Sequence, residues 1–399
     1  MSIAQDVGPQ TGPPKVSPLR DPRVRAIAYQ VVLCAIIAFL VFEAARNALD
    51  NLERARIASG LGFWNQTAGF DISQTLIEYS AQSSTYGRAF WVGLLNTLLV
   101  AVIGIILATI LGFIIGIARL SRNLLVARVA SGYVELIRNL PLLLQLLFWY
   151  NAVLKALPDL RESYTVAGSA FLNNRGLFLP SPIFHSGGWL LFGAFALALV
   201  AAIAFHRVAR RRQLQTGQQL PVLWVTLALF VGLPLLVLLS GEVRVSFSYP
   251  EPGRFNIRGG VEVLPEFVAL LFGLVIYTAS FIAEVVRAGV LAVPKGQIEA
   301  ASALGLRRSA TLRLVVIPQA MRVIIPPLTS QYLNLTKNSS LAVAVGYPDL
   351  VQVFTGTVLN QTGQAVEVVA ITMAVYLTIS LATSFAMNLF NARMAIVER

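Results

Sequence analysis

Long apolar runs separated by shorter polar segments dominate the chain. Eight runs contain almost no charged residue, and each approaches or exceeds the roughly 20 residues that an α-helix needs to cross a bilayer. The pattern therefore predicts an all-α polytopic membrane protein with about eight transmembrane helices, at about 26–42, 90–118, 139–154, 188–205, 220–240, 267–283, 317–336 and 366–390.

Two of the eight runs are irregular. The third is short and contains Pro141, so we expect its helix to extend back toward Glu135. The seventh contains Pro318, Pro326 and Pro327 and becomes polar at its far end. Broken helices are tolerated at membrane depth where protein or a water-filled path satisfies the freed backbone groups, so both runs are candidates for such a path.

Composition agrees with a membrane location. The chain is 56% hydrophobic and 13% charged, whereas soluble domains carry roughly a quarter charged residues. The net charge of +12 does not indicate a nucleic-acid binder, because apolar runs rather than a solvated basic face separate the arginines. Cys34 is the only cysteine, which excludes an internal disulfide and a cysteine-based metal site.

The basic residues predict an orientation. With both termini in the cytoplasm, the inside segments hold 20 of the 31 basic residues, and their net charge is +14 against −2 outside. Residues 1–25 are polar and rich in proline and are expected to be a disordered cytoplasmic lead. Residues 26–88 are expected to form a retained first span and a periplasmic loop, because no convincing signal-peptide cleavage site follows the first apolar run.

The segment 284–322 is the longest basic connection between two spans. Pro294 suits a first helical position, apolar residues recur at helical spacing, and Gly305 can supply a left-handed ending. We expect a surface helix of about three turns, which by physics alone could bind lipid headgroups or a cytosolic protein.

The order of residues in this segment is more specific. It resembles the EAA loop of bacterial ABC importer permeases. The matching residues are Glu299-Ala300-Ala301, then Gly305 after three residues, Val315 after nine more, and Ile317-Pro318 after one more. The stretches YTASFIAEVVRAGVLAVPKGQIEAASALGL and YVELIRNLPLLLQLLFWY are similar to the histidine/glutamine-type polar amino acid permeases, although Asn139 stands where a glycine is more usual. The long form of the chain is most similar to the first permease subunit of general L-amino acid transporters.

The resemblance implies the type I ABC importer (MetI-like) permease fold. It places a transmembrane domain at 89–392, with an insertion at about 155–259 that carries two extra spans and a cytoplasmic EAA coupling loop at 284–322. Glu299, Ala300, Ala301 and Gly305 would form a coupling helix seated on a cytosolic ATPase. The implied function is ATP-driven import of L-amino acids across the bacterial inner membrane, with a sibling permease, two ATPase subunits and a periplasmic amino-acid-binding protein as partners.

No other chemistry is visible in the sequence. The chain lacks the GxxxxGK[ST] phosphate loop, so ATP and magnesium are expected on the partner ATPase and no cofactor on this chain. The two histidines, His185 and His206, flank one span at opposite ends, which argues against a metal pair. We therefore expect a transport subunit that catalyses no bond chemistry.

Polar residues inside spans are costly and mark a candidate translocation path or gate. Two short segments each place an acid three residues before a base, on one helix face; local ion pairing and gate contacts both fit them. Interhelical hydrogen bonding is the competing use of the other candidates. The full set is Asn96, Thr97, Glu135, Arg138, Gln145, Tyr277, Glu284, Arg287, Gln331, Asn334 and Asn338.

An ion-coupled secondary amino acid transporter is the main alternative, since polar broken helices also suit alternating access. An EAA loop has no role in such a protein, and no membrane-buried acid stands out in the sequence as an ion site. A channel is disfavoured because no filter motif is visible.

Overall fold

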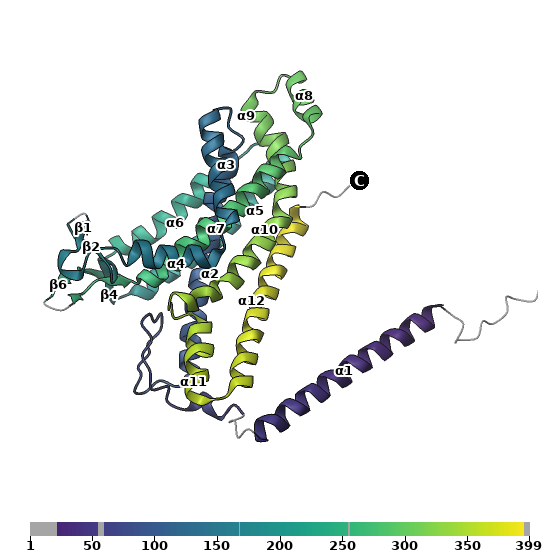
Figure 1. The fold of residues 1–399 in the computed structure, drawn as a ribbon. Coiled ribbons are helices and arrows are strands. Elements are labelled where there is room, and N and C mark those ends of the chain that lie inside the picture. Colours follow the sequence, from purple (N-terminus) through teal and green to yellow (C-terminus); the bar gives the residue numbers. More distant parts are fainter. Residues whose placement is uncertain (1–21, 55–59, 167, 254–255, 395–399) are drawn as a thin grey trace, which may run out of the picture.

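The computed structural model describes residues 22–54, 60–166, 168–253 and 256–394. Of the expected cytoplasmic lead, 1–25, residues 1–21 lie outside the described residues. Twelve α-helices account for most of the described part (Figure 1). They are α1 (Pro22–Arg54), α2 (Tyr86–Ala118), α3 (Leu124–Asn139), α4 (Leu142–Leu147), α5 (Gly188–Thr216), α6 (Val222–Leu239), α7 (Pro265–Leu291), α8 (Lys295–Ala303), α9 (Arg308–Thr311), α10 (Ile317–Asn338), α11 (Leu359–Thr362) and α12 (Ala365–Met394).

Short 3₁₀ and π segments complete the helical path. They are η2 (Gly62–Asn65), η3 (Phe148–Leu154), η4 (Leu160–Glu162), η5 (Leu312–Val316), η6 (Ser339–Ala344) and η7 (Val351–Val358). Seven helical stretches of the described chain are long and apolar enough to cross a membrane, and they account for every expected span except the third.

The third expected span, 139–154, is not one straight helix. The helical path starts earlier, at Leu124, and breaks where Leu140 takes an extended conformation and Pro141 caps α4. The Gln145 side chain donates to the carbonyls of Ile137 and Leu140, both at 3.0 Å. A buried amide thus satisfies the carbonyls that the break exposes, which is the condition for irregular backbone in a bilayer.

The seventh expected span is more regular than its prolines predict. Pro318 lies in the first turn of α10, and the helix continues through Pro326 and Pro327 to Asn338. The irregular stretch comes later, where η6, a turn at residues 345–350 and the π segment η7 follow one another. The polar end of the seventh apolar run is therefore still helical, and the break in the helical path begins after it, at η6.

Helices α2, α7 and α10 form the centre of the bundle. Ala108, Ile282, Val286, Ile324 and Leu335 are among the buried residues of this core. The backbones of α2 and α7 approach closely because α2 presents glycines there. A Cβ on Gly112 would lie 2.6 Å from the Ile282 side chain, and one on Gly116 would lie 2.8 Å from the Ala283 carbonyl oxygen. Gly112 and Gly116, four residues apart on one face of α2, thus form an internal packing surface.

An aromatic cluster closes the end of the bundle opposite α8. Phe63 and Trp64 of η2 pack on Tyr86 and Phe90 of α2 and on Phe354 of η7. The Tyr86 hydroxyl donates to the Gln361 side chain at 3.0 Å. The segment around η2 therefore covers this end of the bundle.

The connections around α5 and α6 contain strands that the hydrophobic pattern did not predict. The segments β1 (Tyr164–Val166), β2 (Ala170–Asn173), β3 (Gly176–Leu179) and β8 (Val261–Val263) form an antiparallel sheet in that order. Two further pairs are β4 (Ser181–Ser186) with β5 (Arg244–Ser248) and β6 (Glu251–Pro252) with β7 (Ile257–Arg258).

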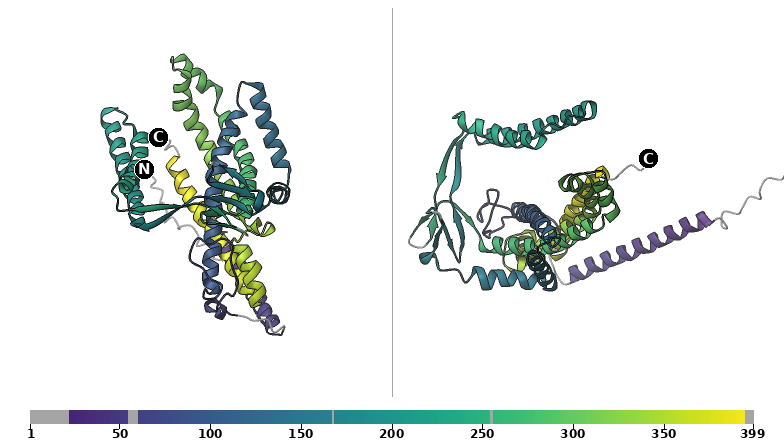
Figure 2. Two further views of the ribbon diagram at one scale, coloured as in Figure 1. Left: turned by 90° about the vertical axis from the view of Figure 1, so that its left-hand side faces the viewer. Right: turned by 90° about the horizontal axis from the view of Figure 1, so that it is seen from above.

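The two extra membrane helices, α5 and α6, form a hairpin mounted on this β structure. They pack mainly on each other, and Figure 2 shows them joined to the rest of the bundle through the strands. Helix α1 also stands apart from the bundle (Figure 1 and the right-hand view of Figure 2), and none of its most apolar window is buried.

Candidate functional site

Helix α8 occupies the predicted coupling segment. It extends over Lys295–Ala303. The sequence predicted Pro294 as the first helical residue, but Pro294 is the residue before the helix. The predicted left-handed ending is present: Gly305 has φ +72°. The Gly305 amide donates to Ser302 O at 2.9 Å and the Leu306 amide to Ala301 O at 3.1 Å, the paired bonds of a Schellman ending.

The EAA residues divide between anchoring and exposure. Ala301 is buried where α8 meets α9 and η5, whereas Glu299, Ala300 and Gly305 are exposed. Leu304 beside them has 81% of its surface exposed. Figure 1 shows α8 at the tip of the bundle, at the end opposite α11. A short helix with small residues and an exposed leucine at such a tip offers a surface for another protein.

The two predicted acid–base pairs meet at one cavity. Glu135 and Arg138 come from α3 and Glu284 and Arg287 from α7, and all four line a space of about 430 Å³. The other lining residues are Arg119, Val134, Asn139 and Phe281. The fold thus places the charged residues of α3 and α7, about 150 residues apart in sequence, around one cavity.

Only one of the two pairs forms the ion pair that its spacing suggested. The Arg287 Nη2 atom lies 2.5 Å from Glu284 Oε1, and Arg119, the residue that follows α2, donates to Glu284 Oε2. In the described part of the chain Glu135 and Arg138 form no ion pair, because the Arg138 guanidinium lies over the Phe281 ring, 4.9 Å from its centre. Arg119 was missed by sequence reasoning, since 165 residues separate it from Glu284.

Two other candidates, Asn96 and Thr97, hold the turn between η6 and η7. Both are fully buried in α2. The Asn96 amide donates to Pro348 O at 2.8 Å, and the Thr97 hydroxyl accepts from the Leu350 amide at 3.0 Å. Gln145, described above, likewise hydrogen-bonds to backbone carbonyls at a break in the helical path.

The remaining candidates lie on α7 and α10. The Tyr277 ring packs against Phe281, with 4.9 Å between ring centres. Gln331, Asn334 and Asn338 fall on one face of α10 at helical spacing. Asn334 is exposed and the other two are half-buried, so this face of α10 is polar and accessible.

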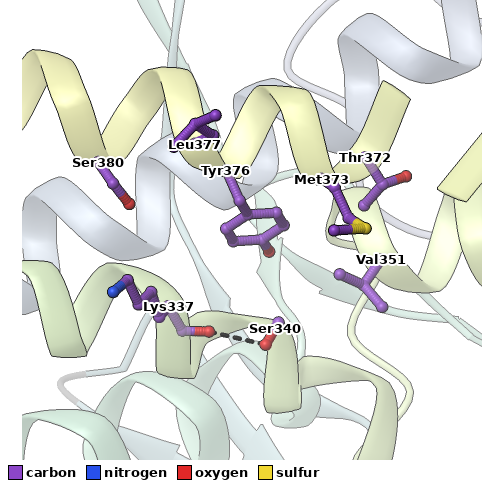
Figure 3. A pocket seen from close by; sticks show the side chains of 8 residues that line it. All are labelled: Lys337, Ser340, Val351, Thr372, Met373, Tyr376, Leu377 and Ser380. Atoms are coloured by element: carbon purple, nitrogen blue, oxygen red, sulfur yellow. Dashed lines mark hydrogen bonds between the residues drawn. The ribbon is translucent and has the colours of Figure 1, made fainter. Parts of the chain in front are cut away.

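A second cavity, of about 500 Å³, lies between the end of α10 and α12 (Figure 3). Lys337 contributes to its wall from within a candidate membrane span, and its ammonium forms no ion pair with any described residue. The signal for it was present in the sequence, as the one lysine in an otherwise polar but uncharged run. The other lining residues are Ser340, Val351, Thr372, Met373, Tyr376, Leu377 and Ser380.

A buried acid lies behind this cavity, in a turn outside the candidate membrane spans. Asp349 is fully buried in the turn between η6 and η7. Its Oδ1 accepts from the Gln352 amide at 2.8 Å and its Oδ2 from the Tyr376 hydroxyl at 3.2 Å. The sequence concealed it because Asp349 follows a proline in what looks like a loop.

Comparison with known proteins shows extensive similarity. The family of binding-protein-dependent transport system inner membrane components matches residues 211–396. The general L-amino acid transport system permease protein AapQ of Rhizobium johnstonii is 54% identical, over 96% of this chain and 95% of that protein. The putative amino-acid ABC transporter permease protein YhdX of Escherichia coli is 49% identical, over 95% and 96%.

A third relative, the glutamate/glutamine/aspartate/asparagine transport system permease protein BztB of Rhodobacter capsulatus, is 43% identical over the whole of both chains. Because these three alignments cover nearly the full length of each protein, the α5–α6 hairpin and its strands lie within the similarity.

Proposed function

Because the chain belongs to the family of binding-protein-dependent transport inner membrane components, as an amino-acid ABC transporter permease of the bacterial inner membrane, we propose that α8 is its coupling helix. Permeases of this kind work with an ATPase and a substrate-binding protein.

The exposed EAA surface is the observation that carries the coupling proposal. Glu299, Ala300 and Gly305 face outward, and the neighbouring Leu304 supplies an apolar contact. The anchored Ala301 fixes α8 to α9 and η5, so a force applied to α8 is passed to α10. Small residues let a groove of the ATPase approach the helix backbone closely.

The charged cavity is our candidate for the gate on the α8 side. Only residues 292–294 separate α7 from α8, so a displacement of α8 acts on the end of α7 that carries Glu284 and Arg287. The contact from Arg119 ties that end to α2. Movement of α8 would therefore break or remake contacts around this cavity.

The cavity beside Lys337 is our candidate for part of the translocation path. An ammonium at membrane depth needs an anionic or polar partner, and the carboxylate of an amino acid supplies one. Serine, threonine and tyrosine hydroxyls of the same wall can bind the polar groups that remain. Gln331, Asn334 and Asn338 would continue this polar path along α10.

The assembly would contain this chain and a sibling permease as a heterodimer, with two copies of the ATPase and a periplasmic binding protein. ATP and magnesium would bind to the ATPase subunits, and this chain would have no ATPase site of its own. Both termini and α8 would lie in the cytoplasm. The domain 89–392 would then form the transport unit, with 26–88 and the insertion 155–259 as additions to it.

Gentle affinity purification from native membranes tests the coupling proposal. The wild-type chain should recover an ATPase and a second permease, and Glu299→Arg should lose the ATPase or its coupling to transport. Glu162→Arg, which makes the same charge change at an exposed position of η4, is the control and should keep both. An unaltered complex with full transport in Glu299→Arg would overturn the proposal.

A further inference from the structure

Helix α5 is much longer than its partner α6. It has 29 residues, against 18 in α6. The ends of the two helices nearest the strands lie level, because Ser186 pairs with Arg244 in the β4–β5 ribbon. Gly187, with φ +69°, meets the Glu242 carbonyl there so closely that a Cβ would lie 2.6 Å from its oxygen.

The extra length of α5 therefore projects from the opposite end of the hairpin. At 1.5 Å per residue α6 is about 27 Å long, close to the hydrocarbon thickness of a bilayer. The first 18 residues of α5 match it, and the 11 that follow, 206–216, extend roughly 16 Å further. Gly217, with φ +73°, ends the helix, and the chain returns to α6 through residues 218–221.

This projection carries a dense group of arginines. Arg207, Arg210 and Arg211 share one helix face with Leu214, and Arg212 lies beside them. All four guanidinium-bearing residues are exposed, and none forms an ion pair with another described residue. Only Ala209 of this segment is buried. The helix thus presents four unpaired cations directly beyond its membrane-spanning part.

Neighbouring residues indicate where the membrane surface lies. Trp224 is the third residue of α6, level with the start of the projection, and is 72% exposed. Tryptophan favours the headgroup boundary. Phe192 and Val200 on the spanning part of α5 are 80% and 64% exposed, as expected of helices that face lipid. The arginines therefore emerge at the height of the lipid phosphates.

We propose that Arg207, Arg210, Arg211 and Arg212 form a binding site for the phosphate headgroups of anionic lipids in the cytoplasmic leaflet. The proposal rests on the cytoplasmic placement of this end of the hairpin. Guanidinium groups bind phosphate through paired hydrogen bonds, and clusters of four or more cations next to a span attract anionic lipids. The site would hold the hairpin, which has little contact with the bundle, at a defined height in the membrane.

Bromolipid quenching of tryptophan fluorescence tests the site. The variant retains Trp224 and replaces Trp64, Trp91, Trp149 and Trp189 with phenylalanine, in vesicles of phosphatidylcholine and phosphatidylglycerol. One of the two lipids at a time carries brominated chains. Brominated phosphatidylglycerol should quench Trp224 more strongly at equal mole fraction, by roughly two-fold, because several charges attract it. Inorganic phosphate in the buffer should leave this preference unchanged. If added phosphate abolishes the preference, the arginines form a site for free phosphate instead.

The controls separate selective lipid binding from simple topology. Arg210→Gln, Arg211→Gln and Arg212→Gln combined should abolish the preference, while lysine at the same positions should keep most of it. A chain that retains only Trp189, at the other end of α5, should show none. Equal quenching by both lipids at Trp224 would overturn the proposal.

A second measurement does not depend on removing tryptophans. Native mass spectrometry of the otherwise unaltered chain, extracted from phosphatidylglycerol-containing membranes, should detect more bound phosphatidylglycerol than in the combined glutamine variant. Equal lipid retention in the two would also overturn the proposal. Neither measurement involves the ATPase. The lipid proposal can therefore be refuted while the coupling proposal stands, and the coupling proposal can be refuted while the lipid proposal stands.

Discussion

Arg119, at the C-terminal cap of α2, and Glu284 of α7 form an ion pair across 165 residues of sequence. The same carboxylate binds Arg287, one turn further along α7. Only 11% of the Arg119 side-chain surface is exposed, so its charge depends on Glu284 for compensation. This contact joins two of the central helices at the wall of the charged cavity.

Removal of the shared carboxylate should weaken the fold. Glu284→Gln leaves Arg119 without its counter-ion, and we expect a loss of about 1–3 kcal/mol of stability, measured by thermal unfolding in detergent. Adding Arg119→Gln to that variant should cost less than Arg119→Gln alone, since coupled residues are not additive. Arg128→Gln, an exposed arginine of α3, is the control and should change stability little. Additive effects of the two substitutions would disprove the pairing.

The ending of α8 should be sensitive to a single methyl group. Gly305 has a positive φ and open space around it, so Gly305→Ala causes backbone strain without a clash, about 1–2 kcal/mol confined to the helix end. We expect amino-acid uptake in proteoliposomes to fall while the melting temperature of the chain stays nearly constant. Gly296→Ala, in the same helix with open space and no positive φ, should transport normally. Equal uptake by both variants would show that the ending is not required.

The contact between α2 and α7 should not accept a Cβ. In Gly112→Ala the new atom would lie 2.6 Å from the branched Cβ of Ile282, so the helices must separate, at a cost of about 1–3 kcal/mol. Gly132→Ala in α3 has free space and should instead be neutral or stabilising, by up to about 1 kcal/mol. Unfolding in detergent measures both, and a stable Gly112→Ala variant would contradict the packing described.

Lys337 should matter for substrate rather than for folding. Lys337→Gln removes the ammonium from the cavity wall, and the loss of a charge-assisted hydrogen bond should reduce uptake at low substrate concentration roughly ten-fold. Lys337→Arg should restore part of the uptake. Lys155→Gln, which removes an exposed lysine near the end of η3, serves as the control. Unchanged uptake in Lys337→Gln would remove Lys337 from the translocation path.

The sequence by itself determined the membrane class, seven of the eight spans and the helix that carries the EAA residues. These features are local, because a span needs only a continuous apolar run and the end of α8 needs only glycine at residue 305. The order of residues around Glu299 then indicated the family. No knowledge of distant contacts was required for any of these conclusions.

Tertiary structure decided how the polar residues are used. The sequence left two uses open for Asn96 and Gln145, and in the folded chain each satisfies backbone carbonyls at a break that only the tertiary structure reveals. Arg119 meets Glu284, and Asp349 meets Tyr376, through packing of helices far apart in sequence. A buried polar group must find whichever partner the packing brings near it, and that partner cannot be read from local sequence.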